Sequence, residues 1–165
     1  MNLFLLLLNF DLIIVSSLNE NDVANYIKST SYSLSIKRST FASFGIETQW
    51  GRSVINNNCN GMQTDGSGWF LQSTYITGVT NFPETGPPPK CRSFATYATW
   101  QKCIDHVLSI MSLRTQGSSL PICPTNKDDA DFFSKGYARH WIVTTDPARI
   151  AACKSVYRRA MTFIN

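Results

Sequence analysis

The clearest periodic pattern in the chain lies between Thr99 and Leu113. Apolar side chains recur there at steps of three and four residues, which places them on one face of an α-helix. They are Trp100, Cys103, Ile104, Val107, Leu108 and Met111. Because this stripe runs through the whole segment, it predicts a buried helix at the centre of the hydrophobic core, opened by Thr99.

Two helices are predicted before it. Asn21 or Asp22 can cap the first, which carries apolar residues on one face. A Ser-rich stretch of weak helix preference follows. Ser39 then caps a second helix, which stops at Gly51 because glycine suits the left-handed position after a helix. Glu47 is the only charged residue in this predicted second helix.

Two more helices are predicted in the C-terminal part of the chain. A short one covers about residues 129–135 and ends at Gly136. The last one begins at Asp146-Pro147, with the aspartate as cap and the proline at the first helical position.

Residues 56–89 have a different texture, in which Asn, Gly, Thr and Pro alternate with single apolar and aromatic residues. This favours short strands and turns, followed by a rigid connector at Pro87, Pro88 and Pro89. The elements together predict an α+β, mainly helical fold. Its helical body and small β-containing lobe would enclose a substrate cleft, where extended polymers bind.

The chain length limits the number of domains, and the net charge limits the kinds of partner that are expected. The chain has 165 residues, 43% of them hydrophobic, which suits one domain of about residues 19–165. A net charge of +4 favours polyanions such as cell wall, nucleic acid or acidic membrane. Because no nucleic-acid motif accompanies the charge, no nucleic-acid partner is expected.

Residues 1–18 form an apolar N-terminal segment that either is a cleaved signal or stays as a helix or strand. It has the length of a signal-peptide core, but no basic residue precedes it and Asp11 interrupts it. It is too short for a stable membrane span, which needs roughly 20 apolar residues. The sequence therefore predicts a soluble protein.

The five cysteines are Cys59, Cys91, Cys103, Cys123 and Cys153. Their odd number and the lack of a C-x-x-C pair favour neither a zinc site nor a complete disulfide framework. Core or free thiols are expected, with a single bridge through Cys91 or Cys123 as the alternative. No metal or organic cofactor is predicted.

Glu47 is the strongest candidate for chemistry. A glycosidase needs a carboxylic acid that stays protonated near neutral pH, and burial among apolar groups raises a carboxyl pKa. Phe44, Ile46 and Trp50 are its neighbours, and the negative end of the helix dipole also disfavours ionisation. The alternative interpretation is that Glu47 only caps the helix or pairs with Arg52.

The segment 46–53, Ile-Glu-Thr-Gln-Trp-Gly-Arg-Ser, resembles the A-x-x-E-S-G-W-G-x-S segment of glucosaminidase-type peptidoglycan hydrolases, glycoside hydrolase family 73 of the lysozyme-like superfamily. In that family the Glu is the catalytic acid. Segment 58–62, Asn-Cys-Asn-Gly-Met, resembles N-L-F-G-I, and 94–97 with Asp105-His106 resembles F-R-x-Y and its D-H pair. Residues 136–138 and 145–147 resemble the closing G-Y-A-T-D-P.

The resemblance covers about residues 22–164 and departs from the family at three places. Thr48 follows the Glu where Ser is usual, Ala95 replaces the Arg of F-R-x-Y, and residues 139–144 are an insertion. Asp105 and His106 are expected to be structural.

The resemblance also implies the other site residues. Glu84 lies near where the family carries a second carboxylate that activates water or stabilises the oxocarbenium ion, and is preferred to Asp65. Tyr137 matches a tyrosine near the catalytic acid. The expected substrate-binding residues are Trp50, Trp69, Asn58 and Gly61. Independently of the resemblance, the apolar ring faces of Trp50, Trp69 and Trp141 suit stacking on sugar rings, with core packing as the alternative for Trp50.

The resulting hypothesis is an endo-acting β-N-acetylglucosaminidase or muramidase-like hydrolase that cuts the glycan strands of peptidoglycan. Alternatives are a lytic transglycosylase, and an inactive lysozyme-like protein that binds walls or forms part of a virion. The short form favours a phage or small bacterial lytic protein, secreted, periplasmic or virion-associated, with phage virion or tail assembly as a further partner.

Overall fold

The computed structural model describes residues 15–64, 74–84 and 90–165. The elements in these ranges follow the order β1 (Val15–Ser16), α1 (Glu20–Ser29), α2 (Leu34–Thr48), β2 (Val54–Ile55), β3 (Ile76–Glu84), β4 (Lys90–Tyr97), α3 (Trp100–Leu113), α4 (Ala130–His140) and α5 (Pro147–Phe163). Trp69 and Asp65 lie outside the described residues, as do Pro87, Pro88 and Pro89. Within the described ranges, no helix is both long and apolar enough to cross a membrane.

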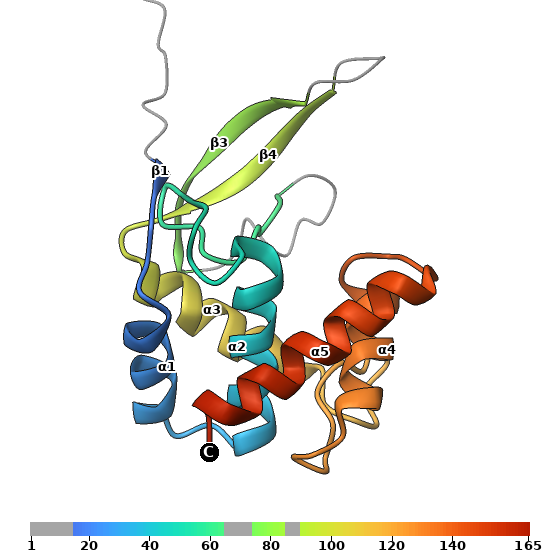
Figure 1. The fold of residues 1–165 in the computed structure, drawn as a ribbon. Coiled ribbons are helices and arrows are strands. Elements are labelled where there is room, and N and C mark those ends of the chain that lie inside the picture. The colour runs from blue at the N-terminus through green and yellow to red at the C-terminus, as the bar shows by residue number, and fades with distance from the viewer. Residues whose placement is uncertain (1–14, 65–73, 85–89) are drawn as a thin grey trace, which may run out of the picture.

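The five helices form a body from which the antiparallel β3–β4 hairpin extends (Figure 1). Helix α2 packs against α1, α3 and α5, while α4 packs against α5. The short strands β1 and β2 pair beside the hairpin. The protein therefore has the α+β, mainly helical fold that the sequence predicts.

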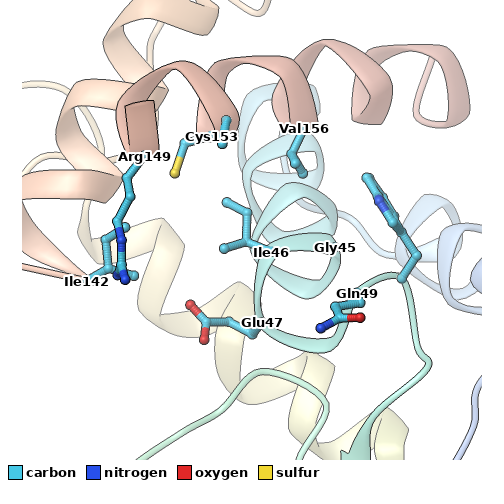
Figure 2. A pocket seen from close by; sticks show the side chains of 10 residues that line it. Gly45, Ile46, Glu47, Gln49, Ile142, Arg149, Cys153 and Val156 are labelled. Atoms are coloured by element: carbon cyan, nitrogen blue, oxygen red, sulfur yellow. The ribbon is translucent and has the colours of Figure 1, made fainter. Parts of the chain in front are cut away.

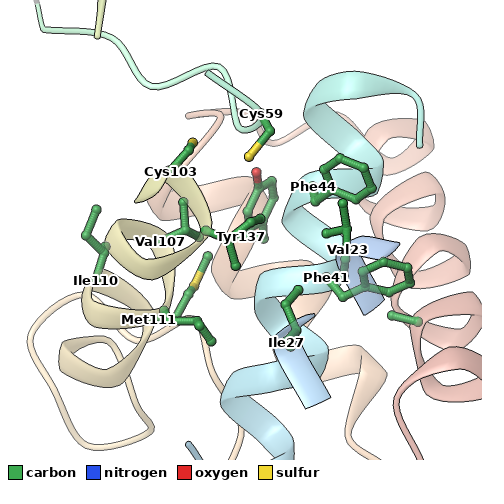
Figure 3. Close-up of a cluster of buried hydrophobic side chains, with 14 of the residues drawn as sticks. Val23, Ile27, Phe41, Phe44, Cys59, Cys103, Val107, Ile110, Met111 and Tyr137 are labelled. Atoms are coloured by element: carbon green, nitrogen blue, oxygen red, sulfur yellow. The ribbon is translucent and has the colours of Figure 1, made fainter. Parts of the chain in front are cut away.

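Helix α3 confirms the strongest pattern in the sequence. Thr99 is its N-cap and accepts a hydrogen bond from the Lys102 backbone N–H at 3.3 Å. Its apolar stripe is buried except for the half-buried Trp100, and Figure 3 shows Val107 and Met111 of this stripe on the side of α3 toward Tyr137. Burial of this stripe supplies much of the hydrophobic contribution to folding.

Helix α2 begins earlier than predicted, at Leu34 with Ser33 as N-cap. Ser39 is therefore an interior residue, and Glu47 is not the only charge in the helix. Packing overrides the weak helix preference of the serines here. The buried Arg38 shows how: its guanidinium donates to the Ile164 carbonyl at 2.7 Å and pairs with Asp128 at 3.0 Å, tying α2 to the C-terminal segments.

The end of α2 is a tight left-handed turn. Gln49, Trp50 and Gly51 have φ values of 52°, 62° and 86°. At Gly51 an added Cβ would lie 2.3 Å from the Leu18 carbonyl oxygen. Glycine is required there both by its conformation and by this close approach. The helix thus stops near Gly51 as predicted, although Gln49 already takes the first left-handed position.

Other helix boundaries differ by a few residues. Asn19, not Asn21 or Asp22, caps α1. Helix α4 continues through Gly136 to His140. Gly136 therefore does not end the helix. An added Cβ there would lie 2.5 Å from the Pro121 carbonyl oxygen, so this glycine allows close packing.

The structure tests two further predictions, one on the C-terminal helix and one on the cysteine thiols. Asp146 caps α5 and Pro147 is its first residue, as predicted. Cys59, Cys103, Cys123 and Cys153 are buried free thiols, so the alternative of a bridge through Cys123 is wrong. The side chain of Cys91 lies outside the described part of the structure.

The β3–β4 hairpin confirms strands in the region of mixed texture. Ile76 pairs with Tyr97 beside the helical body, and Glu84 pairs with Lys90 at the far end. Backbone hydrogen bonds at 2.9 Å and 2.7 Å join Ala95 to Met62 and Thr64 to Ser93. These contacts fasten the loop of residues 58–64 to β4, next to the end of α2.

Candidate functional site

The end of α2 places the Glu47 carboxyl between two hollows. The first lies between α2 and α5, with an estimated volume of about 470 Å³. Figure 2 shows Ile46, Glu47 and Gln49 at the end of α2, facing Arg149, Cys153 and Val156 of α5. The second hollow lies on the other side of Glu47 and is lined by the loop of residues 53–63 and by Phe94 of β4. The carboxyl group is thus reachable from two adjoining spaces.

Glu47 is half-buried, and its hydrogen-bond partner is Tyr137 of α4. The Tyr137 hydroxyl donates to Glu47 Oε1 at 2.7 Å. Burial raises the pKa of Glu47, while the hydrogen bond from Tyr137 opposes part of this rise. The sequence analysis predicts this upward shift in the pKa of Glu47. Among the described residues, Glu47 forms no ion pair with Arg52, so that alternative finds no support.

The absence of a side chain at Gly61 leaves space for the Glu47 carboxyl group. Its φ is +60°, and an added Cβ would lie 2.9 Å from Glu47 Oε2. A larger residue would therefore strain the loop and push the carboxyl group out of place. The sequence analysis places Gly61 among the substrate-binding residues, and its position on the wall of the second hollow is compatible with that. Its contact with Glu47 adds a spatial role.

Asn58 holds the same loop in shape. Its Nδ2 donates to the Met62 and Ala95 carbonyls, both at 2.9 Å, and its Oδ1 accepts from the Met62 backbone N–H at 2.9 Å. The side chain is buried, although the residue also lines the second hollow. Its polar atoms are thus occupied by the protein itself.

Tyr137 is fully buried, and its hydroxyl also lies 2.8 Å from Ser43 Oγ. Ser43 in turn donates to Asn60 Oδ1 at 2.8 Å. Burial and the neighbouring Glu47 carboxyl raise the pKa of Tyr137 well above its ordinary value. Sequence reasoning missed Ser43 and Asn60. The signal for Ser43 was present, because residues four apart share one helix face and Ser43 precedes Glu47 by four.

Trp50 combines packing with a place in the wall of the first hollow. Its ring centroid lies 5.3 Å from that of Phe41 and 6.4 Å from that of Phe163. The Arg159 guanidinium lies 4.3 Å from the ring centroid, within cation–π range. A large part of the ring is thus covered by the protein, and the remainder borders the hollow.

The structure describes Glu84 by its backbone alone. Glu84 is the last residue of β3, at the end of the hairpin that points away from the helices (Figure 1). Its side chain lies outside the described part of the structure, and so do Asp65 and Trp69. The predicted acid and tyrosine therefore meet, whereas the predicted second carboxylate is not placed beside them.

Asp105 and His106 connect parts of the fold. Asp105 Oδ1 accepts a hydrogen bond from the Tyr26 hydroxyl at 2.7 Å, which joins α1 to α3. His106 Nδ1 lies 2.9 Å from the Tyr97 hydroxyl, and burial lowers the pKa of His106 to about 4. Among the described residues, no three His, Cys, Asp or Glu side chains come close enough to hold a metal ion.

Comparisons with known proteins agree with this architecture. No protein-family model matches the sequence, and no curated protein is similar to it. The fold is similar to the crystal structure of a peptidoglycan hydrolase from Sphingomonas sp. A1. The TM-score is 0.54 at 14% identity, over 88% of this chain and 89% of that chain. A point mutant of that hydrolase gives 0.53 at 14% identity, over 88% and 91%.

Proposed function

We propose that this protein hydrolyses the glycan strand of peptidoglycan, with Glu47 as general acid. The observation that carries the proposal is the half-buried Glu47 carboxyl, which stands between two hollows with a raised pKa. The similarity of the fold to a peptidoglycan hydrolase supports it. So does the resemblance of residues 46–53 to the catalytic segment of glycoside hydrolase family 73.

The geometry suits acid catalysis of glycosidic cleavage. A glycan strand that crosses Glu47 would place one sugar in each hollow and the bond between them at the carboxyl group. Glu47 would then give its proton to the glycosidic oxygen as the bond to the anomeric carbon breaks. Tyr137, at 2.7 Å, would hold the carboxyl in its rotamer and support the negative charge left after transfer.

The finer assignment is an endo-β-N-acetylglucosaminidase. In it Glu84 activates the water or stabilises the oxocarbenium ion. Trp50 and Trp69 contribute apolar ring surface to sugar binding, while Asn58 and Gly61 shape the second hollow. The net charge of +4 favours the anionic wall as partner. We place the activity at the bacterial wall, in a secreted, periplasmic or virion-associated protein.

A lytic transglycosylase is the second candidate, and one observation favours it. Such an enzyme needs a single Glu, because the sugar closes onto itself without water. In the described structure the backbone of Glu84 ends β3, at the far end of the hairpin from the helices. A mechanism with Glu47 alone would fit this arrangement.

The decisive experiment is incubation with purified peptidoglycan, followed by mass spectrometry of the new chain ends. A reducing N-acetylglucosamine end would support the glucosaminidase. A reducing N-acetylmuramic acid end would identify a muramidase, and an anhydro-sugar end a transglycosylase. Wall binding without any new ends, in a protein that circular dichroism shows to be folded, would overturn the proposal in favour of an inactive binding or virion protein.

A further inference from the structure

A chain of buried polar side chains runs inward from Glu47. The Tyr137 hydroxyl lies 2.7 Å from Glu47 Oε1 and 2.8 Å from Ser43 Oγ. Ser43 donates to Asn60 Oδ1 at 2.8 Å. Tyr137, Ser43 and Asn60 are all fully buried, so water does not compete for these contacts. The protonation of each group therefore depends on its neighbours in the chain.

The number of available protons determines which group donates in each hydrogen bond of this chain of side chains. Three contacts need three protons, and Tyr137 and Ser43 carry one each. Because Ser43 uses its proton on Asn60 Oδ1, Ser43 Oγ and Glu47 Oε1 compete for the single Tyr137 proton, which the structure shows donated to Glu47. When Tyr137 donates to Ser43 instead, the contact to Glu47 requires a proton on the carboxyl itself. With Glu47 ionised, Tyr137 donates to the carboxylate, and the Tyr137–Ser43 contact has no proton.

Asn60 decides the direction, because its amide is the inner end of the chain. With Oδ1 on Ser43, the amide only accepts, which matches the acid form of Glu47. A flipped amide would donate to Ser43, and the whole chain would reverse to suit ionised Glu47. Among the described residues, Asn60 Nδ2 has no hydrogen-bond partner. Asn60 also stands where the N-L-F-G-I segment has Phe, so this polar end is a departure from that pattern.

We propose that Ser43 and Asn60 are positioning residues that act through Tyr137 to keep the Glu47 carboxyl protonated. The proposal rests on the proposed role of Glu47 as general acid. Within the part of the chain that the structure describes, the other ionisable groups that face Glu47 are Arg149 and Cys153 of α5. The positive Arg149 favours ionisation, and the chain of hydroxyls opposes it. On the loop side, the described polar residues that line the second hollow are Ser53, Asn58 and Gln63, which do not titrate.

The test is a direct titration of Glu47 by carbon NMR of protein labelled in the glutamate side-chain carboxyls. The sequence contains three glutamates, Glu20, Glu47 and Glu84, so the spectrum is simple, and Glu47→Gln assigns the signal. In Ser43→Ala, Tyr137 loses its acceptor and turns its proton to Glu47. The pKa of Glu47 should then fall by roughly half to one pH unit, the value of one neutral hydrogen bond.

Asn60→Leu removes the inner acceptor and should lower the same pKa, which keeps the proposal testable if one variant fails to fold. Ser39→Ala is the matched control, because Ser39 is a buried serine on the same helix outside the chain of hydrogen bonds. It should leave the pKa of Glu47 unchanged. An unchanged or raised pKa in Ser43→Ala would overturn the proposal, since a rise would mean that Asn60 donates.

The titration is independent of activity, so the two proposals fail separately. A lowered pKa in a protein that releases no wall fragments would keep the role of Ser43 and Asn60 in setting the protonation of Glu47 and remove the hydrolase. If the parent is active but the pKa of Glu47 is unchanged in both variants, the hydrolase would stand and the role of Ser43 and Asn60 would be removed. In an active protein, the alkaline limb of the pH–rate profile should move to lower pH in Ser43→Ala, because the general acid must be protonated to work.

Discussion

The helical body and the β3–β4 hairpin hold their functional residues in different ways. Around Glu47, side chains from α2, α4 and the loop of residues 58–62 meet in a buried network. On the hairpin one face packs on the body, as at Thr80, while Val79 on the other face is 38% exposed. The acid is therefore fixed by packing from several elements, whereas the described backbone of Glu84 lies at the end of a two-stranded pairing with Lys90. This contrast predicts different sensitivities to substitution.

The largest effect is expected in the helical body at Glu47. Glu47→Gln keeps the shape and removes the transferable proton. Turnover should fall by roughly 10²- to 10⁴-fold, the range assigned to general acid catalysis, while wall affinity is kept. Clearing of wall suspensions and a pull-down on insoluble walls measure the two quantities. A folded Glu47→Gln that clears walls at nearly the parental rate would remove the catalytic assignment.

A pair of charged substitutions tests the difference in packing. Leu108→Asp in α3 would bury an unpaired carboxylate and should cost several kcal/mol of unfolding free energy. Val79→Asp on the exposed face of β3 should cost under about 1 kcal/mol. Thermal melts of the two variants give the comparison. Equal losses of stability would show that the hairpin is packed as tightly as the body.

These differences also mark how far the sequence could predict the structure. The apolar stripe of α3 could be predicted from the sequence, because the residues that recur at helical spacing are the same residues that are buried. The start of α2 was not, since the contacts that hold Arg38 there come from residues near 128 and 164, far away in the sequence. Glu47 and Tyr137 were found by motif resemblance. Asn60 was not, because its partner Ser43 is 17 residues away and only the folded loop joins them.

The substitution Glu84→Gln tests whether the hairpin contributes a catalytic carboxylate. If Glu84 activates water or stabilises the oxocarbenium ion, hydrolysis should fall by about 10²-fold, while wall binding stays intact. Asp65→Asn is the matched control, since Asp65 is the other candidate carboxylate. Loss in Asp65→Asn alone would transfer the role to Asp65. Full activity in both variants, with anhydro-sugar products, would favour a mechanism with Glu47 alone.

Gly61→Ala tests how tightly the loop confines the acid. The new Cβ would lie 2.9 Å from Glu47 Oε2, and the residue would have to keep a φ of +60°. We expect a loss of about 1–2 kcal/mol in stability from the left-handed conformation, together with reduced turnover from displacement of the carboxyl. Gly117→Ala is the control, because Gly117 has φ +102° with nothing within 4 Å of an added Cβ. Both should lose stability, but only Gly61→Ala should lose turnover.

The smallest effect expected is on the pH dependence of stability. Burial raises the pKa of Glu47 in the folded protein, so the unfolded chain releases this proton at a lower pH than the folded one. The parent therefore keeps its full stability below the pKa of a free glutamate and loses part of it as the pH rises through the pKa of the folded state. Glu47→Gln does not titrate, so its melting temperature should exceed the parent's at neutral pH, and the gain should shrink in acid. Val79→Asp on the hairpin, with an exposed carboxyl, should show no such gain. A parent that is more stable than Glu47→Gln at neutral pH and not in acid would mean that the fold favours the ionised carboxylate, which is the opposite of what a general acid needs.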